Sequence, residues 1–202
     1  MALKPGLYRI HYVPPHVVPP FVGGVQAVGV DLASPVLAMP DSPHIRGVRV
    51  WQVSCAPDNE EQRIITAPGF KPSGIYQGIG PVLPGWGRIP RKKIETEGLD
   101  PAALREADIK ADKEAEEEGI LPFPDLPVLF TPSIKNWNIE ESIDGGGDPT
   151  KATYVISVPT KLPGAISAVT IDKYHLATKT YPIYPSSFPL PAWQFIPVEG
   201  DE

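Results

Sequence analysis

Several features that would define other classes of protein are missing from this sequence. The single cysteine, Cys55, excludes an intramolecular disulfide framework and a zinc site built from cysteines alone. No apolar run reaches the roughly 18 residues that a transmembrane helix needs, so we expect no membrane partner. The formal net charge of −6 argues against a general nucleic-acid binder.

A secretory leader is also missing from the first residues. The opening MALKPGLYRIHYV has none of the continuous apolar stretch that a signal peptide requires. We therefore expect a cytoplasmic protein, with leaderless release left open.

Proline and glycine, in contrast, are abundant, at 27 and 18 of 202 residues. Proline breaks helix interiors and enters strands only at ends, edges and bulges, which excludes a helix bundle and long central strands. Val, Ile and Leu remain plentiful enough for a core, so the chain is not of the disordered type. The composition predicts many short strands joined by rigid loops.

An internal repeat supports this interpretation. Three kinds of segment each occur three times: an alternating strand, a proline-bounded apolar strand and a tryptophan strand. They lie at 7–13, 62–67 and 153–158; at 35–40, 127–130 and 181–185; and at 48–53, 134–139 and 191–196. Ile10, Ile65 and Ile156 take equivalent places in the first kind.

The repeat predicts an all-β chain with a β-trefoil fold, in which three units of about four strands close around a shared core. The single domain would divide into repeats at about 1–57, 58–142 and 143–202. Tryptophan strands supply Trp51, Trp137 and Trp193, which we expect in the core. Trp86, flanked by two glycines, falls outside the pattern and is expected to be exposed.

One segment, residues 99–119, interrupts the second repeat. Its good helix formers, with Asp100 as N-cap, Pro101 at the first turn and Gly119 as a stop, predict a helix. Only Leu104 and Ile109 are sizeable apolar residues inside it. We therefore expect an inserted acidic helix on the surface.

The residues of catalytic and metal chemistry form no known pattern here. The four histidines, His11, His16, His44 and His175, have no metal-ligand spacing, and neither a phosphate-binding glycine loop nor a GxSxG motif is present. Cys55 has no neighbour that would lower its pKa, so a buried, inert thiol is expected. These observations argue against an enzyme, a cofactor and a metal site.

A binding loop is better supported. Residues 14–24, PPHVVPPFVGG, combine two proline pairs with a closing pair of glycines. Such a loop is stiff, which lowers the ordering cost of binding, and its glycines allow close approach to a partner. A loop that only connects strands is the alternative.

The opening GLYRI, the proline-rich stretch ending in Gly23-Gly24, the tryptophan strand at 48–53 and the ending PAWQFIPVEGDE resemble mycocypins. Mycocypins are the β-trefoil cysteine-protease inhibitors of mushrooms, of the clitocypin and macrocypin types. The resemblance covers most of the chain except residues 85–122.

The resemblance implies a reversible, monomeric inhibitor whose partners are papain-like cysteine proteases. Two loops of the first repeat would occlude the active-site cleft. The implied protease-binding residues are Phe21, Val22, Gly23, Gly24 and Val25 in the first loop, and Asp41, Ser42, Pro43, His44, Ile45 and Arg46 in the second.

The family's second activity, against asparaginyl proteases, uses an asparagine in a loop of the second repeat. The matching region here, residues 67–78, has no asparagine. Phe70 and Lys71 are the candidates for a second inhibitory loop, but Pro72 disfavours cleavage after Lys71.

Two other functions stay open at this point. A β-trefoil lectin of the ricin type would need a glutamine two residues before each repeat tryptophan, where this chain has Arg49, Lys135 and Pro191. A serine-protease inhibitor of the same fold would act through an exposed basic loop residue.

Overall fold

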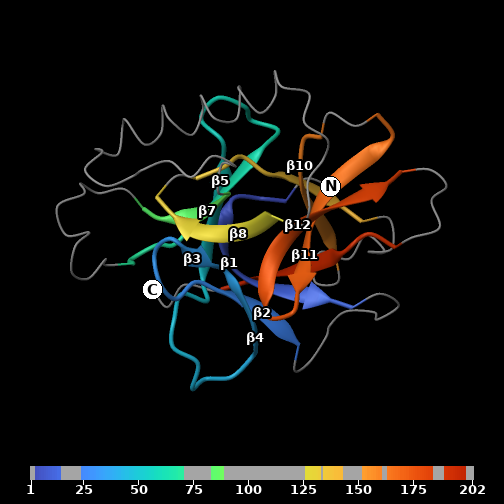
Figure 1. Ribbon diagram of the computed structural model, residues 1–202. Coiled ribbons are helices and arrows are strands. Elements are labelled where there is room, and N and C mark those ends of the chain that lie inside the picture. The colour runs from blue at the N-terminus through green and yellow to red at the C-terminus, as the bar shows by residue number, and fades with distance from the viewer. Residues whose placement is uncertain are drawn as a thin grey trace.

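The computed structural model describes residues 3–14, 24–70, 83–88, 126–132, 134–142, 152–160, 163–183 and 189–198. These residues form an all-β structure (Figure 1). Its strands are β1 Gly6–Val13, β2 Val25–Val28, β3 Ser34–Pro35, β4 Leu37–Pro40, β5 Trp51–Cys55, β6 Arg63–Thr66, β7 Gly85–Arg88, β8 Leu126–Thr131, β9 Asn138–Glu141, β10 Tyr154–Val158, β11 Ala165–Asp172, β12 His175–Pro182 and β13 Ala192–Pro197.

Nine of these strands close into an antiparallel barrel. Around the ring they follow the order β1, β5, β6, β7, β8, β12, β11, β10 and β13, and β13 pairs again with β1. The closing pair runs in continuous register from Tyr8 opposite Pro197 to Val13 opposite Ala192. Closure leaves no free edge in the ring.

The predicted β-trefoil with an inserted surface helix is wrong. The three expected repeats contribute two, three and four strands to the nine-stranded ring, so its strands are not shared equally among them. No helix occurs among the described residues, and the segment 99–119 lies outside them. The pattern of similar strands located most elements correctly, but pairing between strands decides closure, and that is not encoded in the local pattern.

The barrel interior contains the residues that the repeat selected. Ile10, Ile65 and Ile156 are fully buried, as are Trp51, Trp137 and Trp193. The three indole N–H groups each donate to a backbone carbonyl: Trp51 to Ala27 at 3.0 Å, Trp137 to Trp86 at 3.3 Å and Trp193 to Val169 at 2.9 Å. The core role predicted for these three tryptophans is therefore confirmed, and their polar atoms are satisfied inside it.

Trp86 is also in the core, contrary to the expected exposure. It is fully buried between Trp51 and Trp137, with ring centroids 5.7 and 6.1 Å away in edge-to-face geometry. The neighbouring glycine explains the misreading: a Cβ on Gly85 would collide with the Ile65 carbonyl oxygen. This glycine permits close approach of β6 and β7 and does not mark an exposed loop.

Cys55 is the second burial prediction that is wrong. Its side chain is exposed, at the end of β5. Alternation places Cys55 on the same face as the buried Trp51 and Val53, but Cys55 is the last residue of β5, where the chain enters the turn to β6.

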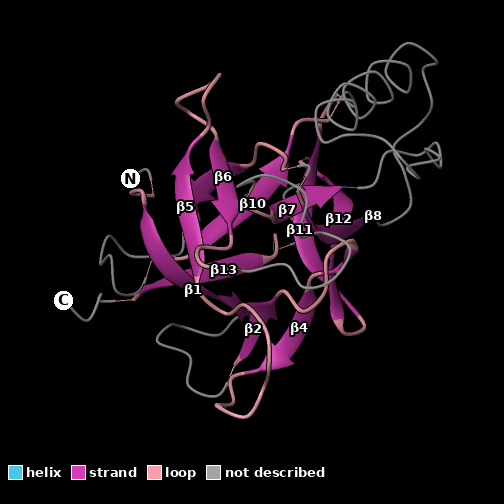
Figure 2. Cartoon of the chain, turned by 90° about the vertical axis from the view of Figure 1, so that its left-hand side faces the viewer, coloured by secondary structure: helices cyan, strands magenta, loops and turns pink. Residues whose placement is uncertain are grey.

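The short strands β2 and β4 pair with each other outside the nine-stranded ring and connect β1 to β12. Figure 2 shows these two strands at the end of the molecule opposite the turn between β5 and β6. Among the described residues, no helix has the length and apolar character to cross a bilayer.

Candidate functional site

The β2–β4 pair brings the end of one predicted loop, Gly24, next to the start of the other, Asp41. Val25 pairs with Pro40 at one end of this ribbon, so the residue before β2 and the residue after β4 are neighbours. The backbone N–H of Asp41 donates to the Gly24 carbonyl at 3.0 Å, which extends the pairing by one step. The segment that ends at Gly24 and the loop that starts at Asp41 therefore share one anchor.

The loop from Asp41 to Gly47 is braced by hydrogen bonds to Ser42. The Ser42 carbonyl accepts from the Ile45 backbone at 3.3 Å and from Arg49 Nη1 at 2.9 Å. The Ser42 hydroxyl accepts from the His44 backbone at 3.4 Å. Pro43 restricts the backbone between these contacts. The loop is thus held in a defined turn before any partner arrives.

The same loop presents most of its side chains outward. Pro43, His44 and Arg46 are exposed, whereas Ile45 is half-buried. This arrangement combines a fixed backbone with free contact groups, which is the combination that lowers the entropy cost of recognition.

The loop returns to the barrel through Gly47. Its φ of +131° is a backbone conformation that residues with a side chain rarely adopt. A Cβ there would lie 2.7 Å from Val28 Cγ1. Directly after it, Val48 and Gly29 exchange two backbone hydrogen bonds of 3.0 and 2.7 Å. Glycine at this position lets the loop close tightly against the end of β2.

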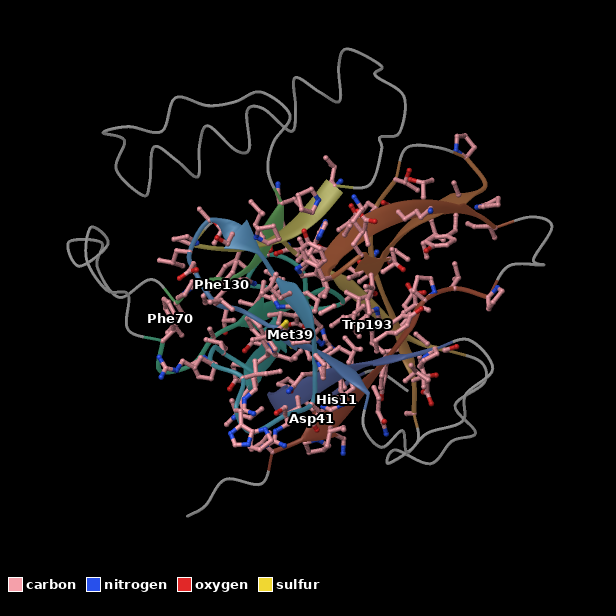
Figure 3. The ribbon with its side chains drawn as sticks, turned by 60° about the horizontal axis from the view of Figure 1, so that its bottom comes forward. His11, Met39, Asp41, Phe70, Phe130 and Trp193 are labelled. Carbon is pink, nitrogen blue, oxygen red and sulfur yellow. The ribbon has the colours of Figure 1, made fainter. Side chains whose placement is uncertain are left out.

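A layer of polar side chains lies beneath the shared anchor. His11 on β1 is opposite Gln26 on β2, and both are buried. Gln26 Nε2 donates to Asp41 Oδ1 at 3.1 Å. Figure 3 shows His11 and Asp41 at the same end of the molecule. The polar layer thereby connects the barrel wall to the start of the second loop.

Burial determines the protonation state of His11. It lowers the pKa of this imidazole below the usual 6.5, an effect that the Asp41 carboxylate opposes and that Arg9 reinforces. At neutral pH His11 is therefore uncharged within the layer.

The residues predicted from the sequence fall into three groups. Phe21, Val22, Gly23 and Lys71 lie outside the described residues. Gly24 is buried at the anchor, Val25 begins β2 half-buried, and residues 41–47 form the braced loop. Phe70 packs on Phe130 with ring centroids 4.9 Å apart, far from that loop (Figure 3). Phe70 therefore packs against the core, and less of its ring is available to contact a partner.

Three residues that anchor the loops were not predicted from the sequence: His11, Gln26 and Arg49. For the first two, the signal was an uncharged polar residue flanked by apolar or aromatic ones, the histidine between Ile10 and Tyr12 and the glutamine between Val25 and Ala27. Such residues are seldom buried without a specific polar neighbour, so each one marks a local network.

Within the described ranges, no group of three His, Cys, Asp or Glu side chains is placed to hold a metal ion. A comparison with models of known protein families gives no match, and neither does a comparison with curated proteins.

Proposed function

We propose that this protein is a reversible inhibitor of papain-like cysteine proteases, acting through the segment that ends at Gly24 and the loop 41–47. The observation that carries the proposal is the hydrogen bond from Asp41 N–H to the Gly24 carbonyl, 3.0 Å long, which joins the two predicted loops at one anchor. This contact places the last residue of the first predicted loop next to the first residue of the second.

Occlusion is the mechanism that fits this arrangement. Pro14, Pro15, Pro19 and Pro20 restrict the backbone of the first loop, and Gly23 removes the side chain near its end. A narrow, stiff loop of this kind can enter a substrate cleft and exclude water from it without offering a bond for cleavage. The braced loop 41–47 would contact the rim of the cleft through His44 and Arg46. Affinity would then come from preorganised shape.

The test is residual papain activity in the presence of micromolar protein, with trypsin assayed in parallel. We expect papain to be inhibited and trypsin to remain active. Inhibition of trypsin alone would favour a serine-protease inhibitor acting through a basic residue such as Arg46. Full activity of both enzymes would contradict the proposal.

Two variants locate the binding surface. Gly23→Trp adds bulk to the first loop and should weaken papain inhibition about 100-fold, the scale of a lost interface hot spot. The matched control is Glu60→Trp, which adds the same bulk to an exposed position in the turn between β5 and β6, at the opposite end (Figure 2). Equal effects of both substitutions, with folding unchanged, would show that the loops are misassigned.

A further inference from the structure

His11 lies in an unusual setting for a buried side chain. It is only 3% exposed, and neither ring nitrogen has a hydrogen-bond partner among the described residues. Gln26, opposite it on β2, is fully buried, and its Oε1 likewise has no partner in that part of the chain. Buried polar atoms are nearly always paired, so a cluster of them without partners calls for a functional explanation.

The cluster connects directly to the anchor of the two loops. From His11, the path crosses to Gln26, whose Nε2 donates to Asp41 Oδ1 at 3.1 Å, and Asp41 N–H donates to the Gly24 carbonyl at 3.0 Å. A rearrangement at Gln26 therefore acts on the residue that joins the loops.

The groups around His11 can be named strand by strand. Arg9 is the nearby charge on β1 itself, and Asp41 is the charge that follows β4. The residues opposite His11 on its two neighbouring strands, Gln26 on β2 and Gln194 on β13, are uncharged. Asp41 is thus the carboxylate that a positive charge on His11 would attract.

We propose that His11 is a proton-sensitive element of the loop anchor, so that acidification loosens the link between Asp41 and Gly24 and releases the bound protease. This proposal rests on the proposed inhibitor function and adds its regulation. It predicts tight binding at neutral pH and weaker binding in acidic media.

The chemistry of imidazole gives the direction. Neutral histidine has one donor and one acceptor, whereas the protonated ring has two donors, a positive charge and no acceptor. A charge at this buried position is costly unless it finds an ion partner. Asp41 is the available partner, and a carboxylate drawn towards the charged ring shifts away from its present contact with Gln26 Nε2, which disturbs the link to Gly24. Burial also lowers the pKa of His11, so the structure as described favours the neutral ring.

The first experiment uses the protein without any protease. NMR follows the His11 Cε1–H resonance and the hydrogen exchange of the Asp41 amide between about pH 7.5 and pH 4, a range that spans histidine titration. We expect the protection factor of the Asp41 amide, its exchange rate relative to intrinsic exchange at the same pH, to fall in acid with the same midpoint as the His11 resonance. A protection factor that is independent of pH, or that follows a different midpoint, would overturn the proposal without use of any variant.

The second experiment measures binding to papain whose active-site cysteine has been blocked by carbamidomethylation, so that catalysis does not enter the measurement. Affinity of the wild-type protein should fall about tenfold or more across the same range, because the binding-competent fraction falls. His11→Gln should remove most of this dependence. The matched control is His175→Gln, which changes a histidine on β12 that lies 3.6 Å from Asp172, and it should keep the full dependence.

The outcomes separate the two proposals. Loosening of Asp41 in acid without papain binding at any pH would refute the inhibitor function and leave the proton-sensitive anchor standing. Papain binding with equal pH dependence in the wild type and His11→Gln would refute the switch and leave the inhibitor function standing.

Discussion

Two buried regions of this molecule differ in the kind of side-chain contact that they contain. In the barrel interior, Trp51, Trp86 and Trp137 pack edge to face. Beneath the loops, His11 and Gln26 are equally buried but present polar atoms without partners among the described residues. The barrel interior is stabilised by apolar contacts. The polar layer beneath the loops forgoes part of that stabilisation.

The difference separates stability from function within one small chain. Apolar packing depends little on pH and fixes the barrel. A buried polar layer is more sensitive to pH, because the low local dielectric strengthens the electrostatic interactions between its members. Placing that layer under the loops connects the most easily perturbed part of the structure to the surface that we propose for binding.

The largest effect is expected from Gly85→Ala, which tests the apolar region. A Cβ at this position would collide with the Ile65 backbone, which cannot move aside as a flexible side chain would. We expect a loss of about 3 kcal/mol or more in the free energy of unfolding, at the upper end of overpacking costs. Chemical denaturation measures it.

Gly69→Ala is the matched control for that substitution. Gly69 has a φ of +69°, but no atom of the described residues lies within 4 Å of an added Cβ. It should cost only about 1 kcal/mol, the penalty of a left-handed conformation for an L residue. Equal costs at the two glycines would show that β6 and β7 are not as closely packed as described.

A smaller effect distinguishes two buried tryptophans. Trp51→Phe removes a hydrogen bond to the Ala27 carbonyl as well as part of the ring, whereas the Trp86 N–H has no partner among the described residues. Trp51→Phe should therefore destabilise the protein by about 1 kcal/mol more than Trp86→Phe, the net worth of one buried hydrogen bond. Urea denaturation of the two variants gives the difference. A greater cost for Trp86→Phe would contradict the assignment of roles within the core.

The tryptophans also show how far the sequence alone can lead. Repetition of similar strands located Trp51, Trp137 and Trp193 correctly, because burial of a large apolar residue in an alternating strand is a local property. The closure of the barrel was misjudged, because it depends on which strand pairs with which. Trp86 was misjudged because glycine has two meanings, a turn or a close approach of two backbones, and the difference lies in a neighbour distant in sequence, Ile65.

The site was predicted in the same uneven way. The resemblance to mycocypins placed a loop at residues 41–47, and the structure has a turn there that is braced at Ser42. The anchor was missed, because a single histidine or glutamine in a strand does not reveal its partner. Gln26 and Asp41 are 15 residues apart in sequence, and only the β2–β4 pairing brings them into contact.

The polar region should respond to pH in a way that the apolar region does not. The pKa of His11 is lowered in the folded protein, so below pH 6.5 the unfolded chain binds more protons at this residue than the folded one. Stability contributed by neutral His11 is present above that value and is lost as the pH falls through the window below it. The urea midpoint should therefore decrease more on acidification in the wild type than in His11→Gln. Trp51→Phe should retain the wild-type pH dependence, and loss of that dependence in this variant would break the comparison.

The smallest effect is expected at the end of the molecule away from the loops. Cys55 is exposed, so a bulky maleimide should modify it in the native protein, without denaturant. It lies at the far end of β5 from residues 41–50 (Figure 2), and the modified protein should inhibit papain as well as the unmodified one. The contrast is the same reagent on Arg46→Cys in a Cys55→Ser background, which should abolish inhibition because the label then occupies the braced loop. If a label on Cys55 abolished inhibition and a label at position 46 did not, the binding surface would lie at the opposite end of the barrel. The buried polar layer would then need an explanation unconnected with binding.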